Sequence, residues 1–222
     1  MPVDFSADHG DWQLSVVVTD PPWYENCYIV RHVPTGKLVV VDPGGSADKI
    51  LAALAEIGGE VECILLTHGH PDHLGAVKRL QDELAVPCKA HRDEGPLIDV
   101  IVNYAKSRLG MTIEPPNAVD YFTDDDRLTL GGQAFRAIPT PGHTPGGVCF
   151  DFGGFTLAGD TLFNQGVGRT DLPGGNGPLL VKSISNLLAA LPDASFIYSG
   201  HGPRWTAGEA KPWWKAMQAY SL

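Results

Sequence analysis

The chain has 222 residues, with 16 basic and 26 acidic side chains, a formal net charge of −10 and 43% hydrophobic residues. This apolar share can build a sizeable core, which excludes a disordered chain. The acidic balance argues against nucleic acid or an anionic membrane as the main partner, because both carry negative charge. We find no linker, low-complexity tract or repeat, so we expect a single domain over residues 1–222.

The N-terminus and the cysteines bear on where the protein resides. The opening stretch MPVDFSADHGDW contains acids and no apolar run, so we expect no secretory signal. No apolar run approaches the ~18 residues of a membrane-spanning helix. Cys27, Cys63, Cys88 and Cys149 form no CxxC pair, which disfavours a disulfide scaffold. These features predict a cytoplasmic protein without a membrane partner.

The predicted elements begin with a strand, a turn and a helix. Lys37–Asp42 (KLVVVD) is a β-branched run that ends at Pro43-Gly44-Gly45, which is typical of a strand followed by a turn. Ser46 is a candidate cap for the next helix, whose apolar residues recur at helical spacing and which Gly58-Gly59 ends.

Further strands and helices alternate after this helix. Val61–Leu66 is the next strand, and the apolar spacing over residues 74–84 predicts one amphipathic helix before a strand at Val86–Ala90. The spacing predicts another helix over Glu94–Leu109, and the acidic stretch Asn117–Asp126 is typical of a loop. The β-α-β-α-β order predicts crossover helices, and the role of Glu94–Leu109 stays open.

The second half changes to hairpins. Glycine pairs at 131–132 and 153–154 separate short strands, which predicts hairpins over residues 127–138 and 148–158. A helix over residues 180–191 and a strand at Phe196–Ser199 follow. Thr206 with Glu209 forms a capping box for a terminal helix. The two halves together predict two sheets with helices outside.

Histidines gather in glycine-flanked loops that directly follow predicted strands. The densest group is Thr67-His68-Gly69-His70-Pro71-Asp72-His73. Side chains at the C-terminal end of a strand project from a rigid base into a cleft. Three imidazoles and a carboxylate in so short a stretch cannot all face a core, because their nitrogens would lack partners. We therefore expect a functional site here, rather than a turn with exposed histidines.

Three more strand ends carry the same side-chain types. His143, Asp160 and His201 each follow a glycine in the loop after a predicted strand. Each alone is more typical of a surface turn, but their joint occurrence after successive strands is not. Five histidines and two aspartates are the right inventory for two divalent metal ions.

The motifs THGHPDH, PGH, AGDTLF and SGH, in this order from Thr67 to His201, resemble the metallo-β-lactamase fold superfamily, and Val39–Gly45 (VVVDPGG) matches its preceding strand. The resemblance implies an α/β fold, a four-layer αββα sandwich of two mixed sheets with helices outside and metals at one edge. It also implies a bridging Asp160, a first metal site and a second one. These two sites comprise His68, His70 and His143, and Asp72, His73 and His201.

The residues around Asp160 narrow the resemblance. Secreted β-lactamases of this superfamily lack a bridging aspartate, which disfavours antibiotic hydrolysis. The run from Gly159 to Gly175 resembles the glyoxalase II-like hydroxyacylglutathione hydrolases, and more closely their short bacterial branch without a helical C-terminal domain. In that group a basic residue at the Arg169 position holds a carboxylate of glutathione, which suits a guanidinium. The alternative for Arg169 is a surface pair with Asp171.

The resemblance implies hydrolysis of an S-acyl-glutathione such as S-lactoylglutathione by a metal-bridging hydroxide. Asp72 and Asp160 would orient the hydroxide and accept its proton. We expect two divalent ions as cofactors, zinc ahead of iron or manganese. Asp42 is expected either to accept a proton from a ligand imidazole or to cap the turn before Pro43.

Other functions stay open from the sequence. A persulfide dioxygenase of the same superfamily would hold one iron through His68, His143 and Asp160, and the run Gly-Arg-Thr-Asp resembles that group as well. The loop around His201 resembles the thioesterase branch better. A lactonase has the same metal ligands but does not usually contain the Gly-Arg-Thr-Asp run. A non-catalytic metal-binding module predicts a missing ligand, and all seven are present.

Overall fold

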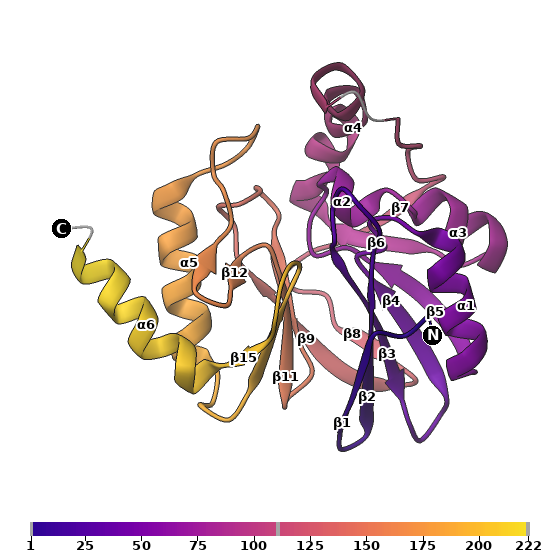
Figure 1. Cartoon of the computed structure of the whole chain (residues 1–222), viewed down its shortest axis with the longest axis horizontal. Helices are drawn as coiled ribbons and strands as arrows, with labels where there is room; N and C mark the ends of the chain where they lie inside the picture. Colours follow the sequence, from indigo (N-terminus) through magenta and orange to yellow (C-terminus); the bar gives the residue numbers. More distant parts are fainter. Residues whose placement is uncertain (1, 110–111, 221–222) are drawn as a thin grey trace.

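The computed structural model describes residues 2–109 and 112–220, whose strands form two large sheets packed face to face (Figure 1). The first sheet has the order β1-β2-β3-β4-β5-β6-β7, antiparallel from β1 to β4 and parallel from β4 to β7. Its strands are β1 (Phe5–His9), β2 (Trp12–Val18), β3 (Asn26–His32), β4 (Lys37–Val41), β5 (Glu60–Leu65), β6 (Cys88–His91) and β7 (Val119–Phe122).

The second sheet has the order β15-β14-β11-β10-β9-β8 and is also mixed, because only β11 and β14 run parallel. Its strands are β8 (Leu128–Leu130), β9 (Gln133–Pro139), β10 (Val148–Asp151), β11 (Phe155–Gly159), β14 (Phe196–Ser199) and β15 (Trp205–Thr206). A small hairpin of β12 (Leu162–Phe163) and β13 (Gly166–Val167) follows β11. The two predicted hairpins at the glycine pairs are therefore confirmed.

Helices cover the outer faces of both sheets. Figure 1 shows α1 and α3 outside the first sheet, and α5 and α6 outside the second. The helices are α1 (Ala47–Ile57), α2 (Pro71–Leu74), α3 (Val77–Leu84), α4 (Gly95–Tyr104), α5 (Gly177–Ala190) and α6 (Ala207–Tyr220). A short 3-10 turn (Arg92–Glu94) precedes α4, and a π-helical turn (Ala105–Leu109) follows it. The expected four-layer αββα sandwich is confirmed.

Three buried clusters hold these layers together, one between the sheets and one under each helical layer. Between the sheets, Phe152 stacks on Phe135 and Phe155 with ring centroids 4.6 and 4.9 Å apart. Phe150 and Phe155 are fully buried there. Burying one such side chain stabilises the fold by about 1.5–3 kcal/mol, so this aromatic layer is a main source of cohesion between the sheets.

The amphipathic helix predicted over residues 74–84 is confirmed for Val77–Leu84, but its predicted start is wrong, because the chain breaks between α2 and α3 at Gly75 and Ala76. Gly75 lies against the turn after β4, where an added Cβ would come within 2.5 Å of the Gly44 carbonyl oxygen. The Ala76 amide donates to the Pro43 carbonyl at 2.9 Å. This close approach to the turn ends α2, the short helix that carries Asp72 and His73.

Two other local predictions are also wrong. The acidic stretch Asn117–Asp126 contains β7, which pairs with β6 and so extends the first sheet. Ser46 precedes α1 but does not cap it through its side chain, since its hydroxyl donates to Asp20 Oδ2 at 2.7 Å instead. The capping box of α6 is confirmed: the Thr206 amide donates to Glu209 Oε2 at 2.7 Å.

Among the described residues, no helix is both long and apolar enough to cross a membrane.

Phe150→Ala is expected to lower the free energy of unfolding by about 3–5 kcal/mol, because it removes a fully buried ring from the layer between the sheets. The control is Val33→Ala at a side chain that is 49% exposed, with an expected change within about 0.5 kcal/mol. Urea unfolding followed by circular dichroism measures both. Equal losses would contradict a shared core between the sheets.

Candidate metal centre

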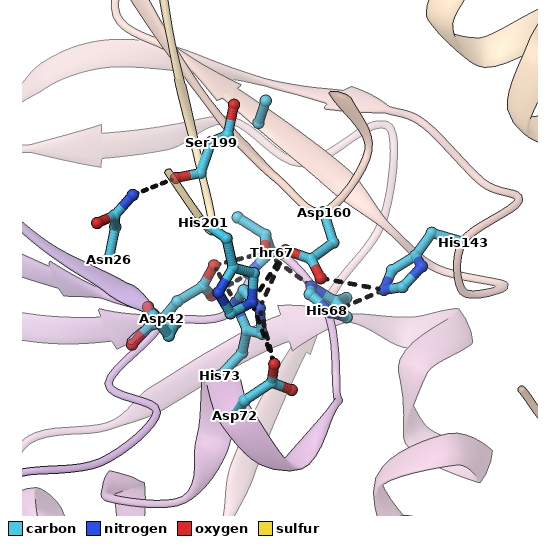
Figure 2. Close-up of polar contacts among 12 residues, drawn as sticks. Asn26, Asp42, Thr67, His68, Asp72, His73, His143, Asp160, Ser199 and His201 are labelled. Carbon is cyan, nitrogen blue, oxygen red and sulfur yellow. Dashed lines mark hydrogen bonds and ion pairs between the residues drawn. The ribbon is translucent and has the colours of Figure 1, made fainter. Parts of the chain in front are cut away.

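The seven predicted ligands meet at one edge of the sandwich, where strands of both sheets end. Figure 2 labels six of them, all except His70. His68 follows β5 of the first sheet, and α2 carries Asp72 and His73. His70 lies between β5 and α2, at the N-terminus of α2. The remaining three side chains come from the second sheet, with His143 after β9, Asp160 after β11 and His201 after β14. The site therefore depends on both sheets and on their packing.

The first group comprises His68, His70 and His143, which are each 2–3% exposed and whose ligand nitrogens lie within 4.8 Å of one another. His143 Nδ1 donates to the Arg169 carbonyl oxygen at 2.7 Å. His68 Nδ1 lies 3.0 Å from Thr67 Oγ1, whose own proton goes to Asp42 Oδ2 at 2.6 Å, so this nitrogen must be the donor. Both Nε2 atoms then present lone pairs, 3.2 Å apart.

Protonation does not relieve this contact between lone pairs. Burial, reinforced by the surrounding imidazoles, lowers the pKa of His68 well below its usual value. Burial also lowers the pKa of His70 to about 3 and pulls down that of His143. Three neutral imidazoles whose ligand nitrogens lie close together are the donor set that a divalent cation such as zinc binds.

The second group comprises Asp72, His73, Asp160 and His201. His73 Nε2 lies 3.3 Å from Asp160 Oδ1, and His201 Nε2 lies 3.2 Å from Asp72 Oδ2. Burial pulls the pKa of His73 down, but the charges of Asp160 and the nearby Asp42 outweigh it and raise that pKa. Burial also opposes the raised pKa of His201, which the hydrogen bond to Asp72 produces. The carboxylates of Asp42, Asp72 and Asp160 thus favour a positive charge in the second group.

Asp160 lies between the two groups, with His143 on one side and His201 on the other (Figure 2). Its Oδ2 is 3.7 Å from His143 Nε2, while its Oδ1 is 3.3 Å from His73 Nε2. Asp160 Oδ1 and the Nε2 atoms of His70 and His73 are buried and form no hydrogen bond. Buried polar atoms without a hydrogen bond are costly even where an ion-pair contact is present, so this donor set fits two cations that share Asp160.

Asp42 lies behind the ligands, buried at the end of β4. Its Oδ2 is 3.0 Å from His73 Nδ1, and its Oδ1 accepts the Thr67 amide at 2.7 Å. The carboxylate therefore fixes the ring orientation of His73 directly and that of His68 through Thr67. Of the two roles expected for Asp42, the contact with a ligand imidazole is present in the structure.

The guanidinium of Arg169 is exposed and forms two hydrogen bonds with Asp171, at 2.7 and 2.8 Å. This is the surface pair that the sequence offered as an alternative. The pair holds the pKa of Asp171 down at about 2. The main chain of Arg169 has a separate function, because its carbonyl accepts His143 Nδ1 and orients that ring. The exposed side chain of Arg169 therefore starts from a main-chain segment that contacts the proposed ligand His143.

Sequence reasoning missed several residues that support the ligands. The Asn26 side-chain amide donates to the carbonyls of Ser199 and Gly202, on either side of His201, at 3.0 and 2.9 Å. The carboxylate of Glu94 accepts main-chain amides of two ligand loops. Neither residue lies within a ligand motif, so only the fold brings them there. Thr67 had a signal, since it directly precedes the first histidine.

We expect the purified protein to retain roughly two divalent ions per chain. After a chelator has removed these ions, adding zinc at 100 times the dissociation constant of a site should raise the free energy of unfolding by about 2.7 kcal/mol for each site filled, because only the folded chain assembles the sites. Asp160→Ala should lose most of both effects. Metal analysis after dialysis and thermal unfolding measure them, with Asp48→Ala at a 95% exposed carboxylate as the control. Full metal content in Asp160→Ala would contradict the shared carboxylate.

Known proteins share this sequence and fold. Residues 20–201 match the model of the metallo-beta-lactamase superfamily. Hydroxyacylglutathione hydrolase GloC of Haemophilus influenzae is 34% identical over 84% of this chain and 90% of its own. The B3 metallo-beta-lactamase BLEG-1 has a TM-score of 0.81 at 33% identity, over 90% of this chain and 96% of its own. TTHA1623 in a di-iron-bound form has a TM-score of 0.77 at 36% identity, over 87% and 96%. The chain belongs to the metallo-β-lactamase superfamily and is a metallo-hydrolase of that family.

Proposed function

We propose that this protein hydrolyses the thioester bond of S-acyl-glutathiones such as S-lactoylglutathione. The observation that carries the proposal is Asp160, which directs one carboxylate oxygen toward each of two ligand groups. The similarity to GloC, a hydroxyacylglutathione hydrolase at 34% identity, supports the substrate class.

The two groups would each hold one divalent ion, with Asp160 common to both. When bound, two such ions lower the pKa of a shared water toward ~7 and polarise a carbonyl oxygen. Zinc suits the imidazole-rich set, and the di-iron form of TTHA1623 makes iron the second metal to test. The ligands proposed are His68, His70 and His143 for the first ion, and Asp72, His73 and His201 for the second.

The chain's own groups direct and deprotonate the attacking water. Asp42, Thr67 and the Arg169 carbonyl hold three imidazoles with Nε2 turned to the centre. Asp160 has a carboxylate oxygen 3.7 Å from His143 Nε2, and Asp72 has one 3.2 Å from His201 Nε2. Both carboxylates would accept the proton of the water. The leaving thiol has an ordinary pKa near ~8.5, so it departs without a strong acid.

Water is the expected nucleophile because the cysteines are poor candidates. All four are free and buried. Burial raises the pKa of each thiol, to about 11 for Cys63 and Cys149. The reactive thiolate is therefore scarce at neutral pH, which favours direct hydrolysis over an acyl-enzyme.

Arg169 is the proposed contact for a glutathione carboxylate. Its guanidinium is 61% exposed and already forms paired hydrogen bonds with the carboxylate of Asp171. A substrate carboxylate would take the same geometry, in exchange for Asp171 or beside it on the remaining N–H groups.

We expect the zinc-loaded protein to hydrolyse S-D-lactoylglutathione, measured as loss of thioester absorbance. Chelator should abolish turnover, and added zinc should restore it. A β-lactam is the comparison substrate, because BLEG-1 is described as a β-lactamase. Turnover of the β-lactam alone would contradict the proposal. Oxygen uptake with glutathione persulfide, without thioester hydrolysis, would instead support an iron dioxygenase.

Arg169→Ala should raise KM for S-D-lactoylglutathione about 10-fold with little change in kcat, since a charge-assisted contact to a remote carboxylate is lost. A lactoyl thioester of N-acetylcysteamine, which has no carboxylate, should show no change in KM. Arg127→Ala, at an exposed arginine before β8, is the matched control. The same rise for both thioesters would refute carboxylate binding by Arg169.

A further inference from the structure

Glu94 is a buried carboxylate that belongs to neither ligand group and joins the loops that carry the first one. Its side chain is fully buried, at the end of the short turn before α4. Its Oε2 accepts the amide of Gly69, and its Oε1 accepts the amide of Gly146, both at 2.7 Å. Gly69 lies between His68 and His70, and Gly146 follows His143 in the other loop.

Gly69 and Gly146 both lie against Glu94 with no room for a side chain, and Gly69 also lies against Ile98 of α4. A Cβ at Gly69 would come within 2.7 Å of Ile98 Cγ1 and 3.1 Å of Glu94 Oε2. A Cβ at Gly146 would come within 2.6 Å of the Glu94 amide nitrogen. The main chains of the two loops are thus fixed against one carboxylate.

We propose that Glu94 is a positioning residue that sets the distance between His68 and His70 on one loop and His143 on the other. The inference rests on the metal centre proposed above. Its basis is that the two loops start from different sheets, β5 in the first and β9 in the second. Their imidazoles must nevertheless converge on one cation, and a side chain bonded to both loops fixes that separation.

A carboxylate suits this task better than other side chains. Each loop turns one amide N–H toward the same buried place, and a buried N–H without an acceptor is costly. The two oxygens of Glu94 provide one acceptor for each loop. A glutamine has a single acceptor oxygen and would turn its NH2 group toward the other N–H.

The second ligand group is supported by residues other than Glu94. Asp42 holds His73, and the Asn26 amide holds the carbonyls on either side of His201. Glu94 contacts neither of these supports through a hydrogen bond that the described part of the chain contains. Loss of its carboxylate should therefore weaken one ion and spare the other.

Cobalt titration in two variant backgrounds tests this selectivity without measuring activity. His201→Ala leaves the first group intact, and His143→Ala leaves the second. Glu94→Gln is expected to lower cobalt affinity about 10- to 100-fold in the His201→Ala chain, and less than about 3-fold in the His143→Ala chain. The visible absorption of bound cobalt should change only in the His201→Ala chain. Asp93→Asn, at a neighbouring carboxylate that is 56% exposed, should change neither affinity.

The outcomes separate the possible failures. Equal losses in the two backgrounds, or no loss in either, would overturn the positioning role of Glu94. If the unmodified chain binds no cobalt at all, the proposed metal centre fails instead. Should Glu94→Gln not fold, Glu94→Asp takes its place and must show the same difference between backgrounds. Failure of both variants to fold would assign Glu94 to general stability and also overturn the proposal.

Discussion

Neutral imidazole nitrogens that converge with their lone pairs facing one another are the constraint on which the rest of this structure depends. His68 and His143 bring their Nε2 atoms to 3.2 Å, and neither nitrogen carries a proton once the hydrogen bonds of Nδ1 are assigned. Asp160 then places one carboxylate oxygen toward each ligand group. In a buried setting such an arrangement is costly by itself, and the pair of divalent cations that we propose would balance it.

The sandwich stabilises this close approach of the imidazoles, because the loops that carry them follow rigid strands. The aromatic layer fixes one sheet against the other. The strands β5, β9, β11 and β14 therefore end at one edge, where the loops that follow them carry the proposed ligands. Hydrogen bonds behind the ligands then set the ring orientations, through Asp42 and the Arg169 carbonyl. Arg169 contacts His143 through its main chain and exposes its guanidinium to solvent. The proposed contact with the substrate therefore lies next to the metal centre.

The sequence predicted those parts of the centre that have a local signal. Loops rich in glycine and proline after predicted strands contain all seven proposed ligands, five histidines and two aspartates, and glycine pairs marked the hairpins. The break after α2 had no such signal, since it depends on Gly75 meeting the turn at Gly44, 31 residues earlier. The acidic composition of 117–126 concealed β7, whose pairing with β6 decides its structure. Glu94 lies 25 and 52 residues from its two partners, so only the folded chain shows its contacts.

Anomalous diffraction from crystals grown with zinc, recorded on both sides of the zinc absorption edge, tests the central claim most directly. The account predicts two anomalous peaks, one among His68, His70 and His143 and one among Asp72, His73 and His201. The Asp160 carboxylate should contact both. A single peak, or two peaks with Asp160 bound to neither, would contradict a centre organised around a shared carboxylate.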